Sequence, residues 1–268
     1  MTFMDKLGVQ TFTLRSALKT PEAIEKALMT AHEIGYSNFE LARIAFDQAT
    51  LAVLKKLQDS RGIRYSTMQI KLKVIERDFE DLVAFAKTLG INSIEVSVIP
   101  LNHFLKGKQG ILDLSKRLNS LGEKCLQNGI KLLYHHHHFE MVRFDGMLSL
   151  ELLMNHTDAR YVNFVCDTYW LARGGFDPFT FVYRHQNRIK GVHLRDIGFD
   201  FKRFSFRQPD ATIGKGAIDF SRFCTLDHLL SISFYSVEQD AEMPFQAIEE
   251  SYKTLKHLSQ KGGEINAS

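Results

Sequence analysis

The feature that most constrains this chain is a regular alternation of short apolar segments with longer amphipathic ones. The short segments have the composition of strands, whereas the longer ones space apolar residues three and four positions apart, as helices do. Strand–helix alternation predicts parallel strands, and eight such units close a (β/α)8 barrel. The eight strand-like segments are residues 7–14, 38–41, 63–72, 91–100, 131–141, 160–167, 188–196 and 233–240.

Helix start and stop signals separate these strands. Thr20 and Asp177 each precede a proline that opens a helix, and Gly35, Gly62 and Gly90 end others. An open doubly wound sheet would place a glycine-rich phosphate loop after the first strand, and none follows here. We therefore predict a single barrel domain. It spans residues 1–268, with a flexible tail at 262–268 and with further helices at about 76–89, 112–126, 147–155, 219 onward and 244–258.

The balance of charge narrows the classes of ligand. With 34 basic and 31 acidic residues the net charge is +3, which argues against binding nucleic acid or a membrane surface. Cys125, Cys166 and Cys224 are widely spaced, so we expect no disulfide framework and a cytoplasmic location. The first strand also begins too early to leave room for a signal peptide. A small neutral or mildly anionic ligand fits this composition, and the sequence leaves a homo-oligomer open.

Polar side chains gather where the predicted strands end. In a barrel of this kind the site is built at the carboxyl ends of the strands, and unpaired buried charges there would cost several kcal/mol each. Asp167, His193 and Glu238 end three successive strands, and their oxygen and nitrogen atoms suit a divalent cation. Simpler roles stay open: a helix cap, a carbonyl contact and an ion pair. Other polar residues at strand ends are Glu40, Gln69, Glu95, His135, His137, Arg195 and Asp240.

Four consecutive histidines, 135–138, follow the apolar start of the fifth strand. If the strand continues through them, side chains alternate, so His135 and His137 share one face. Two imidazoles on one face could bind the same metal. The alternative is a solvated polar turn.

Three motifs resemble the xylose isomerase-like barrel proteins known as sugar phosphate isomerase/epimerases. They are YHHHHFEM at 134–141, close to the family's YHNHDFEF; CDTYWLARGGFDP at 166–178, close to LDTYWVxxGGxDP; and GVHLRDI at 191–197, close to VHLKDM. Weaker matches are GKG at 214–216 and VEQD at 237–240. The resemblance spans nearly the whole chain.

This resemblance implies one divalent metal ion (Mn, Co, Zn or Mg) held by a Glu, an Asp, a His and a second Glu. The last three match Asp167, His193 and Glu238. The first glutamate does not carry over, because His135 occupies its position, with His137 or Glu140 as substitutes if the register slips. The epimerases that this chain resembles use a relay of two metal-bound glutamates, and this relay is therefore altered here.

The resemblance also implies the chemistry. We expect a keto-sugar or cyclitol isomerase or epimerase that moves a proton through a metal-stabilised enediolate, with Glu238 as the leading base and His135 or His137 as its partner. A lyase or dehydratase on the same enediolate is the alternative. Two rivals from other classes are a DNA-repair endonuclease, which the weak net charge disfavours, and a catalytically silent sugar-binding barrel.

Candidate substrate contacts surround these residues. The single tryptophan, Trp170, is expected to stack on a sugar ring or to pack in the core. Arg195 would hold a substrate oxygen or neutralise Glu238. The remaining candidates are Glu40 and Glu95 as hydroxyl binders or structural ion pairs, Lys215 as a basic residue near the mouth, and Lys202, Arg203 and Arg207 as part of a lid.

Overall fold

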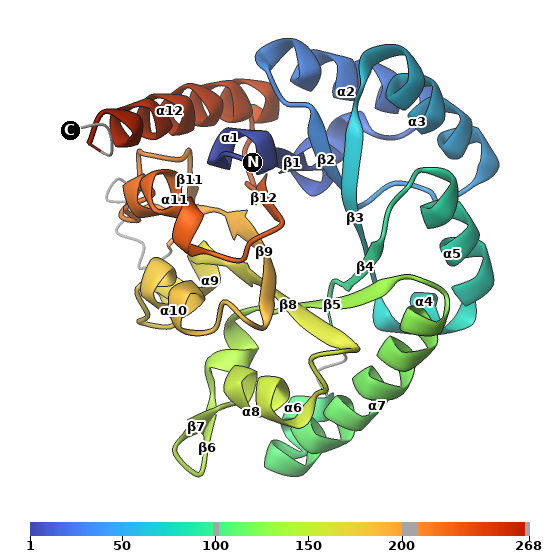
Figure 1. Cartoon of the computed structure of the whole chain (residues 1–268), viewed down its shortest axis with the longest axis vertical. Helices are drawn as coiled ribbons and strands as arrows, with labels where there is room; N and C mark the ends of the chain where they lie inside the picture. Colours follow the sequence, from blue (N-terminus) through green and yellow to red (C-terminus); the bar gives the residue numbers. More distant parts are fainter. Residues whose placement is uncertain (99–101, 200–207, 266–268) are drawn as a thin grey trace.

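A computed structural model describes residues 1–98, 102–199 and 208–265. Within these ranges eight strands close into a barrel in the order β1-β12-β9-β8-β5-β4-β3-β2, and every neighbouring pair is parallel (Figure 1). The predicted (β/α)8 barrel is confirmed. Its strands are β1 (Leu7–Gln10), β2 (Asn38–Leu41), β3 (Arg64–Ile70), β4 (Ser93–Val96), β5 (Lys131–His135), β8 (Val162–Asp167), β9 (Ile189–Leu194) and β12 (Phe234–Val237).

Helices surround the barrel on its outside (Figure 1). The start of α2 follows from the sequence, since Thr20 precedes Pro21 and its hydroxyl accepts a hydrogen bond from the backbone of Ala23. The described helices are α1 (Phe3–Lys6), α2 (Pro21–Ile34), α3 (Gln48–Arg61), α4 (Leu72–Arg77), α5 (Phe79–Thr88), α6 (Asn102–Leu105), α7 (Gly107–Gln127), α8 (Ser149–His156), α9 (Thr168–Arg173), α10 (Pro178–Arg184), α11 (Ser221–Thr225) and α12 (Pro244–Ile265). None of them combines the length and apolar character that a bilayer-spanning helix requires.

Several expected strands are shorter than predicted. The first stops at Gln10, where the 3-10 helix η1 (Thr11–Ala17) begins, and β5 stops at His135, before the 3-10 helix η2 (His138–Met141). Two small hairpins were not anticipated: β6 (Arg143–Phe144) with β7 (Met147–Leu148), and β10 (Asp196–Ile197) with β11 (Asp210–Ala211). Helix α12 runs to Ile265, past the expected start of the tail at residue 262.

The alternation of side chains along the strands separates two environments. In β5, Leu132 and Tyr134 belong to the apolar layer under the helices. Leu133 instead forms a small apolar cluster with Val165 and Phe234. The opposite, carboxyl end of the strands is polar, although Glu40, Glu95, Asp167 and His193 are fully buried there. The barrel therefore has a polar end that apolar packing alone does not explain.

Candidate metal centre

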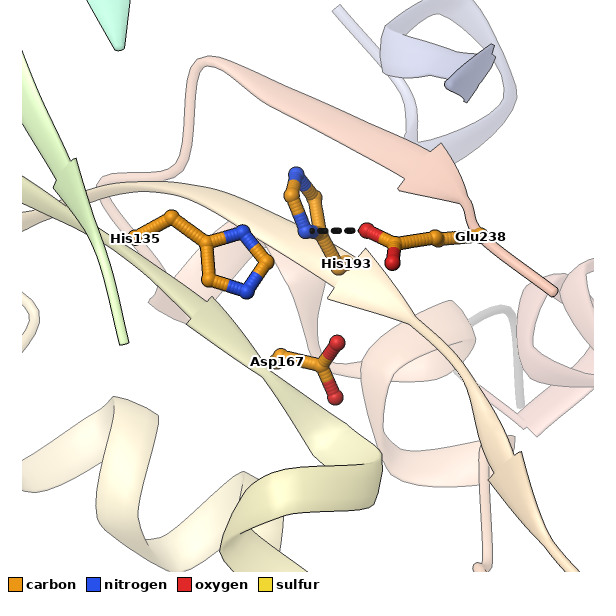
Figure 2. A group of neighbouring side chains, drawn as sticks. All are labelled: His135, Asp167, His193 and Glu238. Carbon is orange, nitrogen blue, oxygen red and sulfur yellow. Dashed lines mark ion pairs between the residues drawn. The ribbon is translucent and has the colours of Figure 1, made fainter. Parts of the chain in front are cut away.

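Four side chains from successive strands converge at the carboxyl end of the barrel. Each offers one ligand atom, and these atoms all lie within 4.8 Å of one another. Figure 2 shows the side chains pointing toward a common centre from β5, β8, β9 and the residue after β12. They are His135, Asp167, His193 and Glu238, the set of residues named from the sequence as metal ligands.

His193 is held by carboxylates on both sides of its ring. Its Nε2 lies 2.9 and 3.0 Å from the two carboxylate oxygens of Glu40, so we assign the proton to Nε2. Its Nδ1 lies 2.9 Å from Oε2 of Glu238. Burial lowers the pKa of His193, but Glu40 and Glu238 outweigh this and raise it well above its usual value. The centre therefore attracts positive charge strongly.

His135 also contacts a carboxylate through one of its ring nitrogens. Its Nδ1 lies 3.3 Å from Oε1 of Glu95 and 3.1 Å from Nε2 of Gln69, which also donates a hydrogen bond of 2.8 Å to Glu95. Burial lowers the pKa of His135 well below its usual value, so the ring is neutral and can bind a metal. A carboxylate behind a ligating imidazole fixes its tautomer and ring orientation.

The unpartnered atoms of this group test whether a cation fits. Among the described residues, one buried atom on each ligand candidate lacks a hydrogen-bond partner, although two of these four atoms, His193 Nδ1 and Glu238 Oε2, lie 2.9 Å apart as an ion pair. The four atoms are His135 Nε2, Asp167 Oδ2, His193 Nδ1 and Glu238 Oε2. Buried polar atoms are costly unless paired, and one divalent cation would pair all four. Two imidazole nitrogens and two carboxylate oxygens suit Mn²⁺, Co²⁺ or Zn²⁺, and less well Mg²⁺.

Asp167 combines the two roles that the sequence left open. Its Oδ1 accepts a hydrogen bond of 3.0 Å from the backbone of Trp170 and so caps α9. Its Oδ2 has no hydrogen-bond partner among the described residues. Burial raises the pKa of Asp167 to about 7. The helix cap holds the side chain in place while its second oxygen remains available.

The histidine run divides between structural and cavity-facing residues. His136 accepts a hydrogen bond from the backbone of Asp167 (3.1 Å) and so ties β5 to β8. The ring of His137 stacks on that of His135, with 4.7 Å between ring centroids. Glu140 lies outside the ligand group: it accepts hydrogen bonds from the Tyr134 hydroxyl and from the backbone of His137 (2.9 Å). Burial raises the pKa of Glu140 to about 7.

A cavity of about 450 Å³ opens onto this group. Arg195 faces it and donates hydrogen bonds to Asp210 (2.9 Å) and Glu238 (3.2 Å), while its guanidinium lies 5.2 Å from the ring of Trp170. The expected ion pair with Glu238 is therefore present. The cavity is lined by Phe12, Arg43, Ile44, Phe46, Gln69, Ile70, Lys71, Val74, Ser97, Val98, His135, His137, Trp170, Arg195 and Glu238.

Three of the expected substrate contacts lie elsewhere. Glu40 and Glu95 are fully buried behind the two ligand histidines rather than on the cavity wall, which matches their structural alternative. Lys215 points away, and its ammonium pairs with Glu250 on α12. The expected role of Lys215 at the substrate is not supported, because the loop around it turns its side chain outward. The lid residues 202, 203 and 207 lie outside the described residues.

Two cations on the cavity wall escaped the sequence analysis. Arg43 follows the end of β2 by two residues, and Lys71 follows β3 directly. The rule that strand-end residues face the site applies to both. Neither residue was predicted from the sequence, in which basic residues at strand ends do not differ from those of solvated loops.

Comparison with known proteins places this geometry in a family. A model described as the xylose isomerase-like TIM barrel matches residues 28–256. The chain belongs to the xylose isomerase-like TIM barrel family. A sugar phosphate isomerase/epimerase from Parabacteroides distasonis has the same fold, with a TM-score of 0.72 at 20% identity, over 96% of this chain and 94% of that one. Another member of this barrel family, from Mycobacterium smegmatis, was solved in complex with magnesium, with a TM-score of 0.70 at 12% identity, over 98% and 99% of the two chains.

Curated relatives carry a more specific name. An inosose dehydratase from Clostridium beijerinckii is 31% identical over 163 residues, which are 56% of this chain and 54% of that protein. Others from Clostridium perfringens are 36% identical over 161 residues, covering 55% of this chain and 54% of theirs. The chain thus matches about half the length of these relatives. Membership of an enzyme family is supported, and the expected isomerase or epimerase activity stays a prediction.

Proposed function

We propose that this protein is a divalent-metal-dependent lyase that removes water from a keto polyol of the sugar or cyclitol class. The observation that carries the proposal is the convergence of four buried donor atoms, on His135, Asp167, His193 and Glu238, next to a cavity that His135 and Glu238 line. When bound, a divalent cation supplies Lewis acidity to a carbonyl and its neighbouring hydroxyl, which makes the adjacent C–H bond more acidic. The curated relatives that are named inosose dehydratases support elimination over isomerisation.

Two cavity-facing residues, His137 and Arg195, would carry out the proton transfer and hold the leaving group. His137 is not in the ligand group, and its ring faces the cavity. It would take the proton next to the carbonyl, so that the electrons of the C–H bond form a C=C bond and those of the C=O bond move to the oxygen, which gives an enediolate. As the C=O bond re-forms, the C=C bond would shift by one carbon and the C–O bond of the hydroxyl on the next carbon would break, and this hydroxyl would leave as water with the proton that His137 had taken. Arg195 would hold the departing oxygen, since its guanidinium reaches both Glu238 and the aromatic wall.

The substitution at the first ligand position also favours elimination. An epimerase removes a proton on one face of the substrate and returns one on the other, so it needs a proton acceptor on each side. The epimerases that this chain resembles use two metal-bound glutamates for this. Here one of these positions holds His135, with Glu95 behind it. Isomerisation or epimerisation remains the second candidate, because His137 and Glu238 both line the cavity and would form a different acceptor pair.

Incubation of the Mn²⁺-loaded protein with 2-keto-myo-inositol in deuterated water tests the proposal. Elimination would give a conjugated product that absorbs in the ultraviolet, whereas isomerisation would exchange a C–H proton without that absorbance. We expect the absorbance to appear and His137→Gln to lower kcat by about 10²- to 10⁴-fold while the metal content is unchanged. His156→Gln, on the exposed face of α8, is the matched control. Proton exchange without absorbance would favour the isomerase.

A further inference from the structure

We propose that the substrate carries an anionic group, and that Arg43 and Lys71 bind this group at the wall of the cavity opposite the metal ligands. The inference rests on the proposed function, because it names the class of substrate that the same site takes. It narrows the keto polyol to an acidic one, which the site would bind more tightly than a neutral one such as 2-keto-myo-inositol. The anionic group is a carboxylate or a phosphate ester, both of which match the donor geometry of arginine.

The charges on the cavity wall are not balanced. The described lining carries three cations, Arg43, Lys71 and Arg195, against the single carboxylate of Glu238. Arg195 is already paired with Asp210 and Glu238. Within the described ranges, neither Arg43 nor Lys71 has a carboxylate within ion-pair distance. Arg43 and Lys71 are thus exposed residues at the cavity mouth without an ion-pair partner in the described part of the chain, and an anionic ligand would supply one.

The order of strands places these two cations across the barrel mouth from the metal ligands. Arg43 and Lys71 follow β2 and β3, which are neighbours in the barrel. In the closed order, β2 and β3 lie opposite β8 and β9, which carry Asp167 and His193. A ligand that spans the mouth would thus have its keto group at one end and its anionic group at the other.

The backbone of Arg43 is held in an unusual conformation. Its φ of 60° lies in the left-handed region, which residues other than glycine and asparagine rarely adopt. Such positions cluster at ligand sites, where the surrounding structure keeps the strain. The guanidinium of Arg43 lies 5.6 Å from the ring of Phe12, another cavity residue, and this contact orients it.

The neighbours of both cations on the cavity wall are apolar. Ile44 and Phe46 follow Arg43, and Ile70 and Val74 flank Lys71. These apolar side chains offer no hydrogen-bond partner to a ligand, so on this part of the wall the two cations are the groups that would hold its polar end.

Binding of three matched keto hexoses to the Mn²⁺-loaded protein tests this inference. D-fructose, D-fructuronate and D-fructose 6-phosphate share the hydroxyketone end and differ at the other end in charge. Calorimetry is carried out on the natural protein, on the double variant Arg43→Asn/Lys71→Gln, and on Lys73→Gln. Asparagine tolerates the left-handed backbone, so the variant should fold. Lys73 is exposed on α4 and is not part of the cavity lining.

We expect one or both anionic ligands to bind at least about 10-fold more tightly than D-fructose, and the double variant to lose this preference while Lys73→Gln keeps it. The tighter of the two identifies the carboxylate or the phosphate. Equal binding of all three ligands, binding of none, or a preference that survives in the double variant would overturn the inference. A preference for the anionic ligands without turnover of any keto polyol would contradict the proposed function and leave the anion site standing.

Discussion

A buried imidazole presents one nitrogen to a metal reliably only when its other nitrogen is held by a partner. Both candidate ligand histidines meet this condition, because Glu40 holds Nε2 of His193 and Glu95 faces Nδ1 of His135. The sequence suggested these glutamates as substrate contacts or ion pairs. Their burial assigns them to the second alternative, as residues that position the ligands.

Replacing Glu40 by Gln tests this positioning. Glutamine keeps the size of the side chain and one acceptor oxygen but removes the negative charge that fixes the proton on Nε2 of His193. We expect the affinity for Mn²⁺, measured by titration calorimetry, to fall about 10- to 100-fold. Glu33→Gln, on the exposed face of α2, is the control and should leave the affinity unchanged. If Glu40→Gln binds Mn²⁺ as tightly as the natural protein does, this glutamate does not act on the metal site.

Three of the four candidate ligand residues that the structure brings together could be predicted from residue type and place alone. Asp167, His193 and Glu238 lie at the ends of three neighbouring strands, and three buried strands rarely each carry an ionisable group there without a reason. His135 needed a motif in addition. The residues that were predicted wrongly or missed lie in loops. There the direction of a side chain depends on backbone turns that the pattern of polar and apolar residues does not fix. Lys215 points outward for this reason, and Arg43 and Lys71 face the cavity.

At the scale of elements, a buried carboxylate organises the loop after β9. Asp196 accepts hydrogen bonds from four backbone N–H groups, those of Ile197, Gly214, Gly216 and Ile218, at 2.9 to 3.1 Å. A Cβ at Gly216 would lie 2.3 Å from Oδ1 of Asp196. The GKG motif is therefore built around this carboxylate, which explains its two glycines better than contact with a substrate does.

Asp196→Asn should weaken the turn at residues 214–218 that this carboxylate holds. The amide turns two N–H donors toward backbone N–H groups that need an acceptor, and the unmet hydrogen bonds cost about 2 kcal/mol. We expect the midpoint of urea unfolding to fall accordingly, while Asp59→Asn, on the exposed face of α3, leaves it unchanged. If the two variants unfold at the same urea concentration, the carboxylate does not support the fold.

Helix boundaries were predicted better than strand boundaries. α2 begins after Thr20 and ends before Gly35, as its capping residues indicated. The expected first and fifth strands ran too far, because polar residues that leave the sheet look like the polar half of an alternating strand. The short hairpins at 143–148 and 196–211 have two-residue strands, too short to leave a periodic signal.

For the whole molecule, Glu140 should couple stability to pH. Its carboxyl group is buried with a pKa of about 7, above the ordinary value near 4.5, so the folded protein binds the proton more tightly than the unfolded chain does. The stability that this group contributes is complete below about pH 4.5 and is lost as the pH rises toward 7. In thermal unfolding, the Tm of the natural protein relative to that of Glu140→Gln should therefore fall between pH 5 and 8. A constant difference would contradict the pKa.

The barrel itself is closed by strands far apart in sequence, and four of its elements meet at the proposed metal centre (Figure 2). An ion bound there would join β5, β8, β9 and the end of β12 in the folded state alone, and so would stabilise the closed barrel. The fold could be predicted from the eight repeated units. The centre also depends on register, since one residue of slip in any strand would turn its ligand out of the barrel.

The most direct test of a divalent metal centre is the metal content of the purified, tag-free protein, determined by elemental analysis for Mn, Co, Zn, Fe and Ni, beside that of Asp167→Ala. We predict about one equivalent of a divalent metal per chain in the natural protein, after reconstitution with Mn²⁺ if needed, and its loss in the variant. Thermal unfolding establishes that the variant is folded. A natural protein that retains no metal after reconstitution, or a folded variant that retains as much, would contradict the metal centre and leave a metal-free sugar-binding barrel as the better account.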